Sequence, residues 1–215
     1  MNYEQARFNM VEQQIRPWDV LDPKVLDLFM STPRHDFVAE SQQALAYSDI
    51  ELPIGEGQTM LPPRIEARIL QALDTAENES VLEVGTGSGY TTALLAKSAN
   101  EVTTVEIFPS LQEIAKTRLN DFNNIHFEQG DAAQNWEDGK SYDVIFLTGA
   151  VASVPEAYKQ KLNLGGRLAL TVGQDHVMTT QILTRVSDTE WETETLFETV
   201  LPFLINAEAK DTFTL

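Results

Sequence analysis

The sequence contains no cysteine, so the chain forms no disulfide and has no thiolate to act as a nucleophile or a metal ligand. Long hydrophobic runs are missing too, because no stretch of eighteen consecutive apolar residues occurs. The first residues lack the basic and then apolar order of a secretory signal peptide. From these absences we expect a cytoplasmic protein with no membrane contact.

Basic residues are scarce: 15 lysines and arginines stand against 33 aspartates and glutamates, and the formal net charge is −18. Nucleic-acid binding draws mainly on lysines and arginines that neutralise phosphates, and no cluster of them is visible, so we expect no nucleic-acid partner. The three histidines, His35, His126 and His176, are scattered, and none has a second ligand at metal-site spacing. We therefore expect no metal ion.

The length of 215 residues, 42% of them hydrophobic, predicts a single domain over residues 1–215. Apolar periodicity predicts helices at residues 3–16, from Pro23 to a stop at Pro33, and at 64–73, with a glycine- and proline-rich loop at 52–63. From residue 81 onward, predicted strands (81–84, 102–106, 125–128, 142–148, 167–172) alternate with predicted helices (90–98, 109–119, 155–162).

This alternation predicts a doubly wound α/β fold, in which helices cover both faces of a mainly parallel sheet. The β-branched alternation at 179–186 and 191–205 predicts a C-terminal antiparallel hairpin that completes the sheet. We expect the domain to divide into an N-terminal helical segment (1–78), a ligand-binding core (79–173) and C-terminal strands (174–215).

The most informative segment joins a predicted strand to a predicted helix through Gly85, Gly87 and Gly89. Glycine permits a sharp turn and leaves room for a ligand near the backbone. The dinucleotide fingerprint needs a sixth-position glycine, but Tyr90 stands there, and no P-loop lysine follows. The remaining pattern is the glycine-rich turn of S-adenosylmethionine-dependent methyltransferases. The alternative is an ordinary strand–turn–helix whose glycines serve packing.

Two acidic residues follow the next strands. Glu106 ends the strand at 102–106, on the carboxyl edge where parallel sheets bind ligands, and its carboxylate can accept hydrogen bonds from both ribose hydroxyls. Asp131 could accept a bond from the adenine amino group, or it could be a turn aspartate. The expected cofactor-binding residues are Gly85, Thr86, Gly87, Ser88, Gly89, Tyr90, Glu106, Ile107, Asp131, Ala132 and Thr148.

Two classes of methyl acceptor are disfavoured. Residues 148–150, Thr-Gly-Ala, stand where amino-group methyltransferases of nucleic acids carry an Asp/Asn-Pro-Pro-aromatic motif. Cytosine-C5 methyltransferases need a cysteine nucleophile, which this chain lacks.

The sequence resembles the protein-L-isoaspartate O-methyltransferase family from residue 10 to about residue 173. The likeness is carried by MVEQQI (10–15), TPRHDFV (32–38), AYSD (46–49), LPIGEGQT (52–59), the glycine-rich segment 81–90, and 164–173. The segments before residue 60 are the specific ones, because general methyltransferases lack them. The resemblance implies an S-adenosylmethionine donor, S-adenosylhomocysteine as product, and methyl transfer to the free α-carboxylate of isoaspartyl residues in damaged proteins or peptides, a protein-repair reaction.

The acceptor side departs from the family pattern. Leu61 stands where the family usually has a serine next to the reacting carboxylate. Gly-Asp-Ala at 130–132 replaces Gly-Asp-Gly, and Thr-Gly-Ala-Val at 148–151 replaces Thr-Ala-Ala-Ala. The segment 200–204 replaces the family's Val-Arg-Phe-Val-Pro-Leu. We predict that Leu61 weakens isoaspartyl methylation.

Carboxyl methylation needs alignment more than acid–base catalysis, because a carboxylate is already ionised at neutral pH. The expected acceptor-side residues are Gln58, Thr59, Met60 and Arg64. The hydroxyl of Thr59 could orient the acceptor, or it could bond the loop backbone. Arg64 could hold an anionic acceptor, or it could lie in solvent. A second hypothesis is a module that binds S-adenosylmethionine and either methylates another acceptor or transfers no methyl group.

Overall fold

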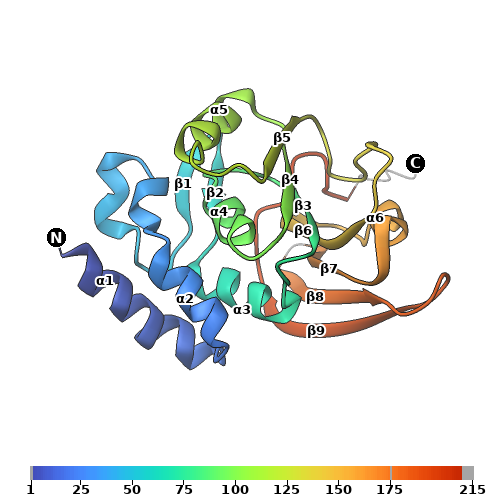
Figure 1. Cartoon of the computed structure of the whole chain (residues 1–215), viewed down its shortest axis with the longest axis horizontal. Coiled ribbons are helices and arrows are strands. Elements are labelled where there is room, and N and C mark those ends of the chain that lie inside the picture. The colour runs from blue at the N-terminus through green and yellow to red at the C-terminus, as the bar shows by residue number, and fades with distance from the viewer. Residues whose placement is uncertain (1, 175, 210–215) are drawn as a thin grey trace.

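A seven-stranded sheet runs through the molecule in the order β5-β4-β3-β6-β7-β8-β9 (Figure 1). The computed structural model describes residues 2–174 and 176–209. The strands are β3 (Ser80–Val84), β4 (Glu101–Glu106), β5 (Ile125–Gln129), β6 (Tyr142–Val151), β7 (Leu162–Gln174), β8 (Val177–Arg185) and β9 (Trp191–Thr199). The neighbouring strands β5, β4, β3, β6 and β7 pair in parallel. The last two pairs, β7–β8 and β8–β9, are antiparallel. The predicted fold, a mainly parallel sheet closed by a C-terminal hairpin, is confirmed.

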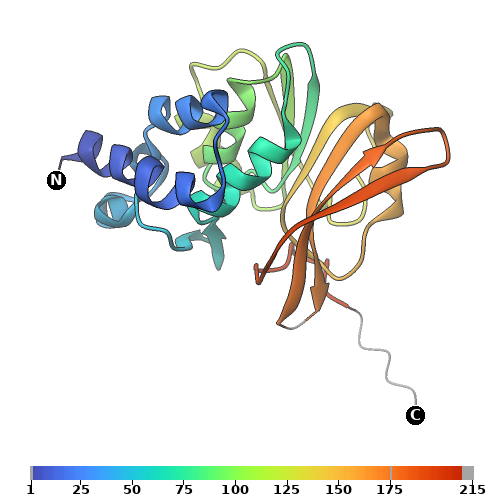
Figure 2. The same ribbon diagram turned by 90° about the horizontal axis from the view of Figure 1, so that it is seen from below.

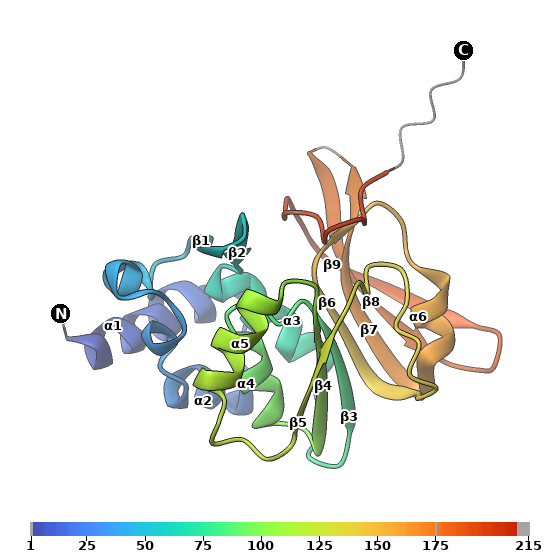
Figure 3. The ribbon, with the colours of Figure 1, turned by 90° about the horizontal axis from the view of Figure 1, so that it is seen from above.

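Helices cover both faces of this sheet (Figure 3). On one face lie α3 (Pro63–Leu73), α4 (Tyr90–Ala96) and α5 (Pro109–Arg118), and on the other lies α6 (Glu156–Lys161). Side chains of one strand alternate between the two faces, so Val81 packs in the larger core cluster and Leu82 in the other. This two-sided burial explains why the central strand β6 has a continuous apolar run at residues 144–147.

The N-terminal helices pack beside α3 and α4 (Figure 2), and at their end the ring of Trp18 contacts that of Phe197 in β9, with centroids 5.5 Å apart. The predicted helix at 3–16 consists of α1 (Tyr3–Met10) and its continuation through π and 3-10 turns to Trp18. For α2 (Pro23–Ser31), the Asp22 carboxylate caps the helix by accepting from the backbone N of Lys24 at 2.8 Å. Two 3-10 helices, Arg34–Phe37 and Glu40–Leu45, follow.

Several predicted elements differ in type or extent, among them the strand predicted at 167–172, which forms β7 from Leu162 to Gln174. Residues 52–63 were expected to be a loop, but they contain an antiparallel hairpin, β1 (Leu52–Gly55) and β2 (Gln58–Met60). Positive φ angles at Gly55, Glu56 and Gly57 make its tight turn. The strand expected at 191–205 ends at Thr199, since Pro202 has no N–H to donate to a sheet.

The residues beyond β9 form a C-terminal segment (residues 200–207) that lies beside the end of β6. The backbone N of Ala150 donates to the carbonyl of Pro202 at 2.8 Å, and the backbone N of Leu204 donates to the carbonyl of Ala150 at 2.9 Å. A third bond, 2.9 Å long, runs from the N of Ala152 to the carbonyl of Ala207. These bonds fix the segment at the carboxyl edge of the sheet.

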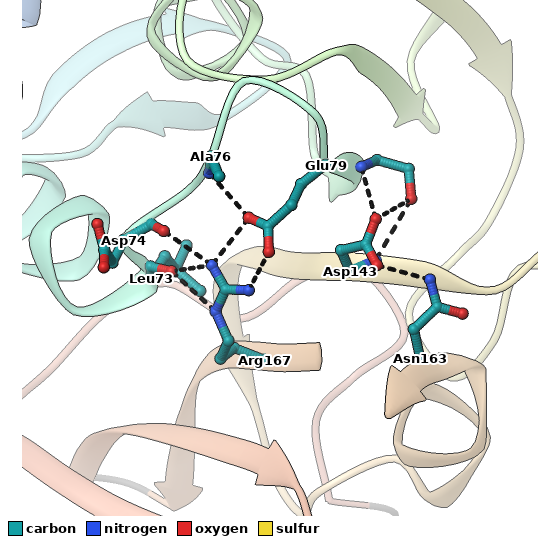
Figure 4. A network of polar contacts seen from close by, with 8 residues as sticks. Leu73, Asp74, Ala76, Glu79, Asp143, Asn163 and Arg167 are labelled. Atoms are coloured by element: carbon teal, nitrogen blue, oxygen red, sulfur yellow. Dashed lines mark hydrogen bonds and ion pairs between the residues drawn. The ribbon is translucent and has the colours of Figure 1, made fainter. Parts of the chain in front are cut away.

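At the opposite edge, a polar network joins β7 to the connection before β3 (Figure 4). The guanidinium of Arg167 donates to the Leu73 carbonyl and pairs with Glu79 (Nη1–Oε1 2.5 Å). Burial opposes ionisation of Glu79, but the contacts with Arg167 and the bond from the backbone N of Ala76 together outweigh it and lower the pKa of that carboxyl. Beside it, Asp143 accepts from both the N and the Oγ of Ser80 at 2.9 Å.

Candidate active site

One cleft opens along the carboxyl ends of the parallel strands. It is lined by the loop after β3, the ends of β4, β5 and β6, the β1–β2 hairpin, and residues 202–205 of the C-terminal segment. The carboxyl edge of a parallel sheet is the usual ligand position in this architecture, because the strand-to-helix loops meet there. The fold therefore brings the predicted donor side and the predicted acceptor side to one place.

The glycine loop between β3 and α4 needs glycine for reasons internal to the protein. The φ angles of Gly85, Gly87 and Gly89 are +96°, +52° and +85°, which side-chain-bearing residues rarely adopt. A Cβ at Gly85 would lie 2.3 Å from Oγ1 of Thr148, and one at Gly87 would lie 3.0 Å from Cδ1 of Ile54. Backbone conformation and packing thus explain these glycines without the close ligand approach that we expected.

Glu106 is the acidic group fixed most firmly at the cleft. Its side chain is 4% exposed, Oε2 accepts from the backbone N of Gly87 at 2.8 Å, and Oε1 accepts from the backbone N of Phe108 at 3.0 Å. Charge-assisted bonds of this kind hold a carboxylate in one orientation. Each oxygen keeps a further lone pair, so the group can still accept two hydrogen bonds from a ligand.

Asp131 follows β5 and lies exposed at the cleft. Its Oδ1 accepts from the backbone N of Ala133 at 3.0 Å, as a turn aspartate does. Its Oδ2 accepts from Nδ2 of Asn206 at 2.8 Å. Sequence reasoning did not identify Asn206 as a partner of Asp131. The available signal was an asparagine directly after an apolar run, since asparagine often adopts the left-handed conformation that Asn206 has, with φ +68°.

Thr148 fixes the end of β6 to the glycine loop. Its Oγ1 lies 2.8 Å from the carbonyl of Val84 and 2.9 Å from that of Gly85. A Cβ on the next residue, Gly149, would lie 3.0 Å from Leu204, so the C-terminal segment packs directly against this strand end. Sequence analysis noted this segment as a departure from the family but not as part of the cleft wall.

Not every expected cofactor residue lines the cleft. Gly89 and Tyr90 do not, whereas the other nine do. Tyr90, the first residue of α4, is fully buried. Its ring centroid lies 5.3 Å from that of Phe37 and 4.8 Å from the guanidinium of Arg34. Its position at the first turn of α4 directs it into the core, which is why spacing alone misplaced it.

The acceptor side contains Gln58, Thr59, Met60 and Leu61, all of which line the cleft. The hydroxyl of Thr59 donates to Oε2 of Glu51 at 3.2 Å, rather than to the loop backbone. Leu61 is 7% exposed and presents only hydrocarbon from its side chain.

Arg64 does not line the cleft, contrary to the interpretation that it holds an anionic acceptor. Its Nη1 pairs with Oδ2 of Asp49 at 2.8 Å, and its guanidinium lies 4.4 Å from the ring centroid of Trp18. These contacts and its 39% side-chain exposure fit the other interpretation, a residue at the surface. In the described part of the chain, no lysine or arginine lines the cleft.

A buried acid lies beneath the glycine loop. Glu83 is 0% exposed, and its Oε2 accepts from Oγ1 of Thr92 at 2.5 Å and from Oγ1 of Thr104 at 2.6 Å. Thr104 in turn lies 2.6 Å from the hydroxyl of Thr86 in the loop. Burial raises the pKa of Glu83 to about 8, so this acid is mostly protonated at neutral pH. The signal in the sequence for this buried acid was a glutamate inside the otherwise apolar run 81–84.

His35 serves packing, whereas Nε2 of His126 lies at the surface, 3.5 Å from Oε2 of Glu101. Nδ1 of His35 lies 2.6 Å from the hydroxyl of Tyr47, and its ring stacks on Tyr3 with centroids 4.0 Å apart. Among residues 2–174 and 176–209, no three histidine, aspartate or glutamate side chains gather closely enough to hold a metal ion. None of the helices in this same part is both long and apolar enough to cross a membrane.

Comparison with known proteins fits this architecture. The family model for protein-L-isoaspartate(D-aspartate) O-methyltransferase matches residues 5–205. A protein-L-isoaspartate O-methyltransferase of Syntrophus aciditrophicus is 39% identical over 188 residues, which cover 86% of each chain. One from a Picosynechococcus species is 44% identical over 169 residues, covering 78% of this chain and 76% of its own.

A solved structure shares the whole fold. A putative protein-L-isoaspartate O-methyltransferase from Plasmodium falciparum, crystallised with S-adenosyl-L-homocysteine, superposes with a TM-score of 0.79 at 19% identity and covers 95% of this chain and 98% of its own. The family match over residues 5–205 and the extensive identity with curated relatives confirm the resemblance seen in the sequence. This chain belongs to the protein-L-isoaspartate(D-aspartate) O-methyltransferase family.

Proposed function

We propose that this protein transfers a methyl group from S-adenosylmethionine to the free carboxylate of isoaspartyl residues in damaged proteins or peptides. The observation that carries the donor half of the proposal is the Glu106 carboxylate, held in the cleft by the backbone N–H groups of Gly87 and Phe108. The acceptor half rests on membership of the family.

The donor side offers chemistry that fits a nucleoside. Glu106 would accept hydrogen bonds from the two ribose hydroxyls through its remaining lone pairs. Asp131, on the neighbouring strand end, would accept one from the adenine amino group. When bound, S-adenosylmethionine supplies an electrophilic methyl group on a positively charged sulfur.

On the acceptor side, the residues of this chain orient the substrate and exclude water. The β1–β2 hairpin supplies Thr59, Leu61 directly follows it, and the C-terminal segment supplies Phe203 and Leu204. No general base is needed, because a carboxylate is ionised at neutral pH. The protein's contribution is to hold an oxygen of that carboxylate in line with the methyl group, which accounts for a large part of such a rate enhancement.

A second candidate is a protein that binds the same donor but methylates a different acceptor, or none. It is favoured by the acceptor side itself. The hydroxyl of Thr59 is bonded to the Glu51 carboxylate, and Leu61 has no polar group to offer a substrate carboxylate.

The experiment that separates these candidates combines binding with turnover. Calorimetry with S-adenosylhomocysteine tests the donor site, and release of S-adenosylhomocysteine from S-adenosylmethionine tests transfer, using one isoaspartyl peptide and its matched aspartyl peptide. Turnover restricted to the isoaspartyl peptide supports the proposal. Binding without turnover on either peptide supports the second candidate, and absence of binding contradicts both.

A further inference from the structure

Arg34 is a buried residue that bonds to the acceptor side of the cleft and packs on the first residue of α4. The residue is 0% exposed, on the 3-10 helix Arg34–Phe37. Its Nη2 donates to the backbone carbonyl of Leu61, on the acceptor side. Its Nη1 donates to Oε2 of Glu66 at 2.9 Å, and its guanidinium packs over the ring of Tyr90.

Glu66 continues this connection toward the donor side. It is 1% exposed on α3, and its Oε1 accepts from the hydroxyl of Thr91. Thr91 lines the cleft, and it belongs with Tyr90 to the first turn of α4, directly after the glycine loop. A continuous set of polar contacts therefore runs from the Leu61 backbone through Arg34 and Glu66 to Thr91.

Such a buried ion pair is costly to the fold, because both charges lose their hydration. Burial raises the pKa of Glu66, and the contacts with Arg34 and Thr91 only oppose that shift. Apolar side chains of similar volume often serve stability as well as a buried pair does. Stability alone therefore gives no reason for Arg34 and Glu66 at this position, whereas a fixed geometry does, because the planar guanidinium donates in two set directions.

We infer that Arg34 is a positioning residue for methyl transfer, which sets the separation between the Leu61 backbone and the first turn of α4. This inference rests on the proposed function. Displacing reacting groups by about 1 Å can cost roughly a hundredfold in rate, although no residue at the reacting atoms has changed. Loss of Arg34 should therefore lower kcat while the donor, held by Glu106, still binds.

The test replaces the pair by apolar side chains, Arg34→Met with Glu66→Leu, so that no unpaired charge is left buried. Its matched control is Arg167→Met with Glu79→Leu at the opposite edge of the sheet. Arg167 also pairs with a glutamate and also donates to a backbone carbonyl, that of Leu73, but it lies outside the cleft. Arg34→Lys is the second variant, since a lysine keeps the charge beside Glu66 but lacks the two-pronged geometry.

We expect both double variants to bind S-adenosylhomocysteine within about threefold of the native Kd. The Arg34/Glu66 variant should lose at least about tenfold in kcat on an isoaspartyl peptide, and the control should stay within about twofold. If the Arg34/Glu66 variant does not fold, Arg34→Lys should show the same lowered kcat at unchanged donor Kd. Three results would overturn the inference. They are an unchanged kcat in the folded Arg34/Glu66 variant, an equal loss of kcat in both double variants, and a loss of kcat accompanied by an equally large weakening of S-adenosylhomocysteine binding.

A second readout needs no turnover. Hydrogen exchange of residues 58–61 is compared with and without S-adenosylhomocysteine. We expect the ligand to slow exchange in the native protein and to have no such effect in the Arg34/Glu66 variant, although it still binds. Slowing that persists in the variant, or that is absent from the native protein, would overturn the inference. Native protein that binds the ligand without turnover would contradict the proposed function instead, and the exchange comparison would still decide about Arg34.

Discussion

The carboxylate of Glu106 accepts a 2.8 Å hydrogen bond from the backbone N of Gly87, so the acid proposed to bind the donor also fixes the loop proposed to surround it. Removing Glu106 would therefore act in two ways, by deleting a ligand contact and by releasing the loop. A variant that keeps an acceptor oxygen separates these effects, because glutamine can still bond a backbone amide.

We expect Glu106→Ala to weaken S-adenosylhomocysteine binding by about 1.5–3 kcal/mol, roughly tenfold or more in Kd, because bonds to a charged group are lost. Glu106→Gln should weaken it less. Isothermal titration calorimetry measures both, with Glu101→Ala as the control, since Glu101 begins the same strand at the other edge of the sheet. Equal affinity in Glu106→Ala and the native protein would contradict the assignment.

Leu61→Ser should raise kcat/KM on an isoaspartyl peptide. The substitution adds a hydroxyl on the cleft wall, and the Leu61 backbone stays bonded to Arg34. One recovered bond to a charged group is worth about 1.5–3 kcal/mol, a rise of roughly ten- to a hundredfold. Leu45→Ser, at an exposed leucine, is the control. Strong native turnover that Leu61→Ser lowers or leaves level would mean that the acceptor is oriented by another group.

Glu83 should make the stability of the protein fall as the pH rises. Its pKa is raised from an ordinary value of 4.5 to about 8 by burial, so the folded state binds a proton more tightly than the unfolded state. The stability that protonated Glu83 contributes is fully present below about pH 4.5 and is lost as the pH rises toward 8. Glu83→Gln should therefore gain stability relative to the native protein between pH 5 and 9, by about 3–5 kcal/mol. Scanning calorimetry across this range tests the sign, and a constant difference would refute it.

The protein should show no affinity for RNA or DNA at physiological salt. Its net charge of −18 repels phosphates, and no lysine or arginine lines the cleft in the described part of the chain. Fluorescence anisotropy with labelled single- and double-stranded oligonucleotides is the measurement. Micromolar binding at that salt concentration would show the expectation to be wrong.

Sequence reasoning succeeded where a local pattern controls the structure. The apolar run 81–84 forms β3, and the Asp22-Pro23 pair begins α2 as a capping residue followed by proline should. Glu106 was recognisable because its position at the end of a parallel strand fixes where its side chain can lie. The division of the domain at residues 78 and 173 stays a prediction.

Sequence reasoning failed where contacts between residues distant in the sequence determine the structure. Nothing in the local pattern pairs Arg34 with Glu66, 32 residues away. The two interpretations of Arg64 could not be separated from the sequence, because its partners Asp49 and Trp18 are distant along the chain. The β1–β2 hairpin was hidden by the glycines and prolines that make its turn, since these residues more often indicate an irregular loop.

The position of the C-terminal segment has a consequence for the order in which the protein matures. Residues 202–205 complete the cleft, yet they pair with the end of β6, about fifty residues earlier in the chain. During synthesis, the glycine loop, Glu106 and the β1–β2 hairpin leave the ribosome well before this last wall. This wall of the cleft is therefore the last of its parts to be synthesised, after every strand of the seven-stranded sheet.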